Sequence, residues 1–210
     1  MSEVIQGSDE WRLARCGSLG ASQIADMMAR TKSGWGASRT NLAAQLVVER
    51  LTGQPTETYK NAAMQWGNDN EADARVAYCY RTDKTVEEVG IVPHPTIAGT
   101  HASPDGLVED DGLVELKCPL SATHIETLLG DTVPSKYVLQ VQWQLACTGR
   151  QWCDLVSYDP RMPEAMQLAV FHVKRDDKQI ADLENHARAF VAGIDATVKL
   201  LRSRYLGEPA

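Results

Sequence analysis

Carboxylates and a lysine gather in a short stretch of this sequence, Thr100 to Pro119. Asp105 follows a proline, and Glu115 and Lys117 interrupt a later apolar run. Side chains two residues apart on a strand point to the same face, so Glu115 and Lys117 share one face if the run is extended. Two carboxylates suit Mg²⁺, which is usually held by one or two of them together with phosphate oxygens. The stretch predicts phosphate chemistry, in which Asp105 and Glu115 bind the ion and Lys117 orients the attacking water. A solvent-exposed Glu-x-Lys on an edge strand is the alternative interpretation.

The residues around these side chains predict a β-hairpin. The apolar segments His101 to Glu109 and Gly112 to Cys118 lie on either side of an Asp-Asp-Gly turn. Asp-Gly supplies the positive φ that tight hairpin turns need. Val114, Leu116 and Cys118 would then form an apolar face opposite the charged one.

The spacing of apolar residues predicts helices and strands on both sides of the hairpin. Ser22 is expected to cap a short helix, and Ala72, Val76 and Tyr80 are expected to form the packed side of a longer one. Helices are expected over residues 40–52, 60–82, 121–129 and 135–149 and from 176 onward, and strands over 85–92, 151–158 and 166–174. Such an order predicts an α/β fold with a central mixed sheet flanked by helices.

Composition excludes several classes of protein. The 210 residues are 43% hydrophobic and 23% charged, as in ordinary globular domains, so we expect one domain over residues 1–210. No apolar run approaches the ~20 residues of a membrane span, and no leader is recognised, so we expect a cytosolic protein without membrane contact. Five scattered cysteines indicate neither a zinc site nor a disulfide framework. The net charge of −7 argues against a protein that coats itself in nucleic acid.

One segment is rich in basic residues despite this acidic balance. It runs from Arg12 to Arg39, and its cations lie among glycines and serines. A solvated, flexible loop is one interpretation. A phosphate pocket is the other, because arginine forms bidentate contacts with phosphate and serine hydroxyls add donors.

The order of several motifs resembles a known family. Ser103-Pro104-Asp105-Gly106-Leu107 and then Glu115-Leu116-Lys117-Cys118-Pro119 are similar to the PD-(D/E)xK nuclease core, in the form found in the phage lambda exonuclease family of viral recombination nucleases. Further motifs of that family recur in the same order over residues 11–175: Trp11 to Arg15, Gly20-Ala21-Ser22, Ser33-Gly34, Trp66-Gly67 with Glu71, Gln140-Val141-Gln142 and Tyr158 to Met162.

The resemblance implies a restriction-endonuclease-like α/β fold. It also implies an exonuclease that degrades one strand of linear double-stranded DNA from the 5′ end and leaves 3′ single strands for recombination. Hydrolysis would follow a two-metal mechanism with Mg²⁺, for which Mn²⁺ is a possible substitute. The family forms a homotrimeric ring around DNA and works with a single-strand annealing protein. A ring needs only its inner surface to be basic, which would reconcile an acidic chain with DNA. A phage or prophage origin in a bacterial cytoplasm follows from the same resemblance.

The resemblance also assigns roles to residues. Asp105, Glu115 and the Leu116 carbonyl would bind the metal, Glu71 would assist at a second ion, and Lys117 would activate water. The terminal 5′-phosphate would be bound by Arg15, Ser22, Lys32 and Ser103. Lys32 replaces the arginine usual at its position, so it can attract phosphate only as a point charge. Contacts to DNA are expected from Arg12, from Met64 as an apolar wedge, and from Gln140, which could instead hold a water. The simpler alternatives are that Met64 is a core residue and that Gln140 is a hydrated surface amide.

Two other functions remain open from the sequence. An endonuclease with the same core would cut covalently closed circles, which an end-dependent exonuclease leaves intact. A catalytically silent module that binds DNA ends would give no metal-dependent product.

Overall fold

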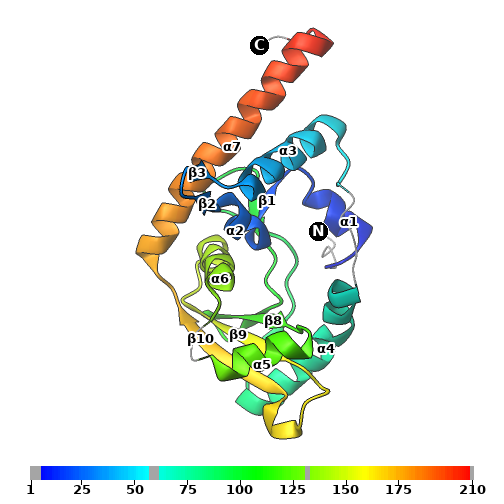
Figure 1. Cartoon of the computed structure of the whole chain (residues 1–210), viewed down its shortest axis with the longest axis vertical. Coiled ribbons are helices and arrows are strands. Elements are labelled where there is room, and N and C mark those ends of the chain that lie inside the picture. Colours follow the sequence, from blue (N-terminus) through cyan, green and yellow to red (C-terminus); the bar gives the residue numbers. More distant parts are fainter. Residues whose placement is uncertain (1–5, 57–61, 131–132, 209–210) are drawn as a thin grey trace.

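A five-stranded mixed sheet forms the centre of the fold (Figure 1). The structure is a computed structural model that describes residues 6–56, 62–130 and 133–208, so both ends of the predicted domain, 1 and 210, lie outside the described residues. Strand β8 pairs in parallel with β9, and the other pairs are antiparallel. In spatial order the strands are β10 (Leu168–Lys174), β9 (Trp152–Tyr158), β8 (Gly112–Lys117), β7 (Gly106–Val108) and β4 (Val86–Glu87). The predicted mixed α/β architecture and the strands over 151–158 and 166–174 are confirmed.

The predicted hairpin is present as β7 and β8, with Val108 opposite Gly112. The positive φ of its turn lies at Glu109 (50°), and Gly112 is instead the first residue of β8. The expected first strand is also divided, because Pro104 lacks the N–H that a ladder requires. Its beginning, β6 (Thr100–Ala102), belongs to a separate three-stranded sheet with β1 (Leu19–Gly20) and β5 (Val92–Pro93). The strand predicted over 85–92 was likewise wrong, since β4 and β5 lie in different sheets.

Helices cover both faces of the central sheet. On one face α4 (Ala62–Thr82) packs Ala74 and Tyr78 against Val114. On the other face α6 (Ser135–Thr148) packs Val141 and Leu145 against Leu113. Helix α5 (Ser121–Leu129) lies next to β9. The face of β8 that carries Leu113 therefore lies under α6.

The packed side of α4 differs from the prediction. Val76 is 68% exposed and Tyr80 is 92% exposed, whereas Asn70, Ala74 and Tyr78 are buried. Both stripes follow helical spacing, and the buried one is inconspicuous in sequence because it contains an asparagine and an alanine. Residues 60–61 of the predicted helix lie outside the described residues.

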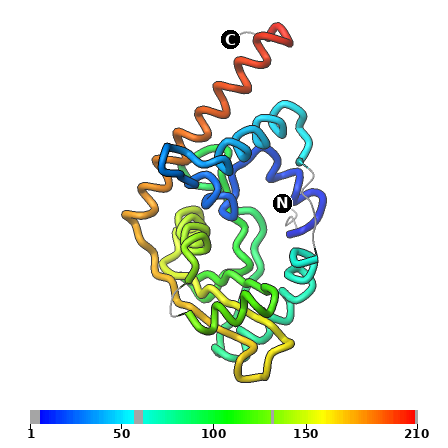
Figure 2. Tube along the Cα trace, viewed as in Figure 1, coloured from blue at the N-terminus to red at the C-terminus, as the bar shows by residue number. Residues whose placement is uncertain are grey.

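The N-terminal segments and the last helix form a second apolar core around Leu19, Ile24, Leu46, Trp143 and Phe190. Its helical residues come from the 3-10 turn η1 (Ala21–Gln23), α2 (Ile24–Met27), α3 (Ala37–Thr52) and α7 (Asp177–Leu206), with Trp143 from α6; the short helix α1 (Asp9–Ala14) contributes no buried residue. Helix α3 ends as predicted at Gly53, whose φ of 67° is left-handed. The last part of α7 projects from the body of the molecule, as the trace in Figure 2 shows.

Two local predictions in this region were wrong. Ser22 lies inside η1 and does not cap it; Gly20 precedes the turn, and its N–H donates to Gln23 Oε1 at 2.9 Å. The expected basic loop contains a small hairpin, β2 (Arg30–Thr31) and β3 (Gly34–Trp35). All five cysteines are free, and no helix within the described residues is long and apolar enough to cross a bilayer.

Candidate active site

Strand β8 places Glu115 and Lys117 on the face covered by α6, as their spacing predicts. Lys117 Nζ donates a hydrogen bond to Glu115 Oε1. Glu115 is only 2% exposed, whereas the Lys117 side chain is 27% exposed. The pair therefore lies neither on a solvent-exposed face nor on an edge strand, so the alternative interpretation of this Glu-x-Lys was wrong.

Two amides complete the surroundings of the Glu115 carboxylate. Gln140 Nε2 donates to Oε1 and Gln144 Nε2 donates to Oε2, each at 2.5 Å. The two glutamines lie one turn apart on α6 and so project from the same face of the helix. From the sequence Gln140 was preferred to Gln144 as a site residue, although the spacing of the two indicates that both project from one face. Three donors thus stabilise a carboxylate that burial alone would penalise strongly.

Asp105 lies in the link between β6 and β7, beside the same strand. Its Oδ2 accepts a hydrogen bond from the Leu116 N–H at 2.7 Å. Burial raises the pKa of Asp105 well above its ordinary value, and the negative charge of Glu115 adds to this effect while Lys117 opposes it. The hydrogen bond to the Leu116 N–H places Asp105 next to Glu115 along β8, as the sequence predicts.

Glu71 approaches the site from α4. Burial raises the pKa of Glu71, Arg75 opposes the shift, and Glu115 again contributes to it. Arg75 Nη2 donates to Glu71 Oε1 at 3.2 Å, and Arg75 also pairs with Glu88. Glu71 therefore belongs to the acidic group but is held at its edge by an arginine.

Lys117 is the cation inside this acidic group. Burial lowers the pKa of Lys117, but the charges of Glu115 and Asp105 outweigh burial and raise it above the ordinary value. Lys117 is therefore an ammonium ion here.

The donor set suits a divalent cation with oxygen ligands. Asp105, Glu115 and Glu71 supply carboxylate oxygens here, and the charge of Glu115 contributes to the raised pKa values of Asp105 and Glu71. Within the described part of the chain, no group of three Asp, Glu, His or Cys side chains is placed to hold a metal ion. Mg²⁺ is usually bound by one or two carboxylates, with waters and substrate phosphate oxygens as its further ligands.

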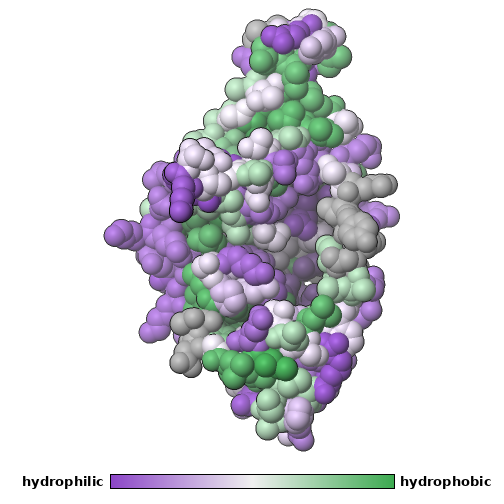
Figure 3. All heavy atoms as spheres, viewed as in Figure 1, coloured by the Kyte–Doolittle hydropathy of each residue, from purple (hydrophilic) through white to green (hydrophobic). Residues whose placement is uncertain are grey.

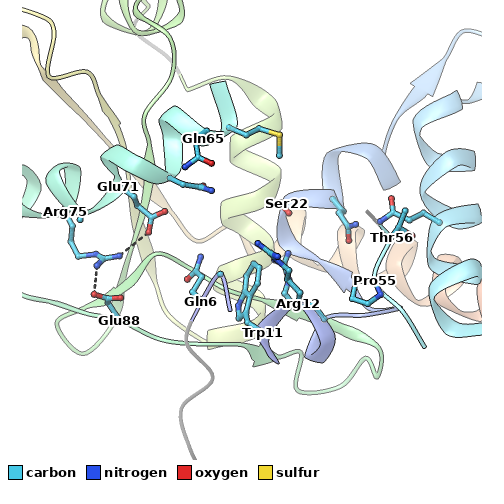
Figure 4. A pocket seen from close by; sticks show the side chains of 17 residues that line it. Gln6, Trp11, Arg12, Ser22, Pro55, Thr56, Gln65, Glu71, Arg75 and Glu88 are labelled. Atoms are coloured by element: carbon cyan, nitrogen blue, oxygen red, sulfur yellow. Dashed lines mark hydrogen bonds and ion pairs between the residues drawn. The ribbon is translucent and has the colours of Figure 1, made fainter. Parts of the chain in front are cut away.

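A cavity of about 1230 Å³ opens beside Glu71 (Figure 4). One wall is formed by α4, which contributes Glu71 and Arg75, and the opposite wall is formed by α1 and η1. Of the residues predicted to bind DNA or its terminal phosphate, four line this cavity: Arg12, Arg15, Ser22 and Met64. Met64 is 48% exposed, so its interpretation as a core residue was wrong.

The other three residues predicted to bind DNA or its terminal phosphate do not line the cavity, and neither do Asp105, Glu115, Leu116 and Lys117. Lys32 is exposed in the turn between β2 and β3. Ser103 is half-buried next to Pro104, and its Oγ makes no hydrogen bond within the described residues. Gln140 contacts Glu115 and is not a hydrated surface amide.

Two arginines of the basic segment are engaged in contacts within the protein. Arg30 and Arg39 both stack on the Trp35 ring, with guanidinium carbons 4.0 and 3.9 Å from its centroid. Arg39 additionally donates to the Met27 carbonyl. These two cations are occupied in holding β2 and β3 against α3.

Comparison with known proteins places the chain in a family. Residues 10–151 match the YqaJ-like viral recombinase domain. The crystal structure of an alkaline exonuclease (LHK-Exo) from Laribacter hongkongensis is similar, with a TM-score of 0.89 and 47% identity over 95% of this chain and 99% of that chain. Its complex with dAMP gives a TM-score of 0.89 and 48% identity, with the same coverage.

Two more distant matches are a solved structure and a viral sequence relative. A phage-related exonuclease from Haemophilus somnus 129PT has a TM-score of 0.69 at 11% identity, over 88% of this chain and 96% of that chain, which shows a shared fold alone. Uncharacterized protein R354 of Acanthamoeba polyphaga mimivirus is 31% identical over 110 residues, 46% of this chain; the chain spans only 20% of that relative's length. With its acidic strand and mixed sheet, the chain therefore has a restriction-endonuclease-like fold and belongs to the YqaJ-like viral recombinase domain family, of the lambda exonuclease type.

Proposed function

We propose that this chain is a DNA nuclease of recombination, and specifically a Mg²⁺-dependent exonuclease that degrades one strand of linear duplex DNA from the 5′ end, leaving a 3′ single strand. The observation that carries the proposal is the buried Glu115 carboxylate, held by Lys117 and two amides beside Asp105. This arrangement occurs in a chain that is 47% identical in sequence to an alkaline exonuclease. The buried, hydrogen-bonded setting of these groups favours chemistry over a silent binding role.

The carboxylates would hold the metal. Asp105, Glu115 and the Leu116 carbonyl are the proposed ligands of one Mg²⁺ ion, and Glu71 is the proposed contributor to a second; Mn²⁺ prefers the same oxygen donors. Bound divalent ions supply polarisation of the phosphodiester and a more acidic nucleophilic water. Glu115 is already oriented for this role by the donors on both of its oxygens.

Lys117 is the proposed group that positions the water. An ammonium has three N–H donors, and one of them is directed to Glu115 Oε1. The others can hold a water, or a phosphate oxygen, next to the acidic group. Lys117 thereby aligns the nucleophile for in-line attack and offsets the charge that develops on the phosphate.

The cavity is the proposed seat of the DNA end. Arg15 and Ser22 would bind the terminal 5′-phosphate, with Arg12 on the backbone. Met64, a half-exposed hydrophobe on α4 that lines this cavity, would act as the wedge that separates the strands. Lys32 and Ser103 carry the same phosphate role in the proposal, but they would have to reach the phosphate from outside the lining of this cavity.

A digestion panel tests the function. Linear duplexes with 5′-phosphate or 5′-hydroxyl ends and a covalently closed circle are incubated with Mg²⁺, with chelator, and with chelator followed by excess Mg²⁺. We expect mononucleotides from linear DNA alone, only with the metal, and faster from phosphorylated ends. Cutting of the circle would identify an endonuclease, and binding of ends without any product would identify a silent module.

A further inference from the structure

Arg15 is a half-buried cation that pairs with no carboxylate among the described residues. It lines the cavity. Burial lowers the pKa of its guanidinium, and the more distant charge of Glu49 only partly opposes this. An arginine desolvated without an anion beside it is a site prepared for an anionic ligand.

His101 fixes the orientation of this arginine. Arg15 Nε donates to His101 Nε2 at 2.9 Å, and the guanidinium carbon lies 3.9 Å above the Trp11 ring. Because Nε2 accepts, the neutral imidazole carries its proton on Nδ1, which can donate to Ser18 Oγ at 2.8 Å. Burial and the neighbouring Arg15 lower the pKa of His101 to about 4, so the ring stays neutral.

The backbone is shaped for this contact. His101 lies on β6, directly beside Gly20 on the parallel strand β1. A Cβ at Gly20 would lie 3.0 Å from His101 Nε2 and 3.2 Å from Arg15 Nη2. A side chain there would crowd the histidine–arginine pair, so glycine permits its close packing.

We infer that His101 is a positioning residue for recognition of the terminal 5′-phosphate: it orients Arg15 and, as a neutral acceptor, leaves the charge of Arg15 for the phosphate. The inference rests on the proposed function. Only Nε of Arg15 is hydrogen-bonded within the described residues, so both Nη groups remain for a bidentate contact. A carboxylate as the acceptor would neutralise the charge of Arg15.

The test compares three substitutions at one position. His101→Leu removes the acceptor, His101→Asp makes it anionic, and His101→Gln keeps it neutral. For each, kcat and KM are measured on linear duplexes with 5′-phosphate and 5′-hydroxyl ends in Mg²⁺, and binding of inorganic phosphate is measured by calorimetry. His186→Gln serves as the control, because His186 lies on α7 and does not line the cavity.

We expect the preference for phosphorylated ends to fall by about tenfold or more in His101→Leu and His101→Asp, the loss of one charge-assisted contact, mainly through KM. Rates on 5′-hydroxyl ends should change little, and His101→Gln should retain most of the preference and of the phosphate binding. Gly20→Ala, which crowds the same pair, should reproduce the loss if a variant at position 101 does not fold.

Other results would contradict the inference. Equal losses on both kinds of end would make His101 merely structural, and an unchanged preference in His101→Asp would show that the charge of Arg15 is not used. If the wild-type protein digests no DNA, the proposed function fails on its own; binding of inorganic phosphate, and its loss in His101→Asp, then decides the inference.

Discussion

At the scale of single residues, the site depends on how one buried carboxylate is held. Glu115 accepts hydrogen bonds from Lys117, Gln140 and Gln144, which span β8 and α6. Hydrogen bonds to a charged group are worth more than those between neutral groups, and a lost one exposes the full cost of burying the charge. The donors should therefore affect both stability and catalysis.

Gln144→Met tests the effect of these donors at Glu115 Oε2, which accepts from a single donor within the described residues. The variant leaves Glu115 Oε2 without its amide in a site that is 2% exposed. We expect a loss of about 1.5–3 kcal/mol in the free energy of unfolding. Added Mg²⁺ should restore part of it in urea titrations, because a cation can neutralise the same oxygen. Gln151→Met, at an exposed position, is the control, and equal midpoints for the two variants would disprove the role.

Lys117→Met tests the chemistry at this site. The side chain is 27% exposed and Met has a similar length, so the variant should lose stability with the lost donor but remain folded in the absence of denaturant. The rate of digestion should fall by about a hundredfold to a thousandfold, as when one donor to a transition state is removed. Lys178→Met, on the exposed first turn of α7, should digest normally. Near-normal cleavage by a folded Lys117→Met protein would show that the assigned role is wrong.

His101 makes the fold sensitive to acid. Its pKa is about 4 in the folded protein against an ordinary 6.5, so below pH 6.5 the unfolded chain binds a proton that the folded chain does not. Relative to His101→Gln, the wild-type protein should lose about 3 kcal/mol of stability as the pH falls from 6.5 to 4. Urea midpoints of both proteins across this range measure the difference, and parallel curves would contradict it.

At the scale of elements, the alternation of apolar and charged side chains along β8 could be predicted from the sequence, because one face of the strand is wholly apolar. Val114, Leu116 and Cys118 are buried together, and the opposite residues meet α6. The buried face of α4 could not be predicted from the sequence, because it depends on a partner far away in the chain: Tyr78 donates to the buried Asp154 at 2.7 Å. The division of the strand at Ser103 to Asp105 also depends on a second sheet that only the fold assembles.

The site was predicted to a similar extent. The motif identified Asp105, Glu115 and Lys117, because their types and spacing carry the chemistry. The amide of Gln144 and the imidazole of His101 were not identified as functional, since each matters only through a contact far away in the sequence. Trp35, which occupies two arginines of the basic segment, was missed for the same reason.

A pair of tyrosines on α4 tests which face of this helix is packed. Tyr78→Phe removes a donor from buried Asp154, whereas Tyr80 is 92% exposed. We expect Tyr78→Phe to lower the free energy of unfolding by about 1–3 kcal/mol and Tyr80→Phe to leave it unchanged. If the two substitutions had equal effects in urea unfolding, the observed packing of α4 would be contradicted.

At the scale of the whole molecule, an acidic chain must bind an acidic polymer. The net charge is −7, yet Arg12 and Arg15 gather at one cavity. A ring of copies would confine DNA to such basic surfaces and exclude it from the acidic exterior. Leu200 and Leu206 are exposed on the projecting end of α7, where Figure 3 shows apolar side chains. We propose such a homotrimeric ring and a single-strand annealing partner, with the bacterial cytoplasm as the setting.

Multi-angle light scattering tests the ring. We expect a mass three times that of the chain, independent of dilution over the concentrations used for digestion, because a closed ring satisfies every interface. A monomer mass would remove the explanation of how this acidic chain retains DNA, and a dimer would require another geometry.

The polarity of digestion tests the central claim most directly. A linear duplex with 5′-phosphates carries an isotopic label in either the 5′-terminal or the 3′-terminal nucleotide, and label release is followed with Mg²⁺ for the wild-type protein and for Glu115→Gln. We predict immediate release of the 5′ label as a mononucleotide, late or no release of the 3′ label, and no release by Glu115→Gln. Early release of the 3′ label, or undiminished release by Glu115→Gln, would contradict the claim that this acidic site degrades DNA from the 5′ end.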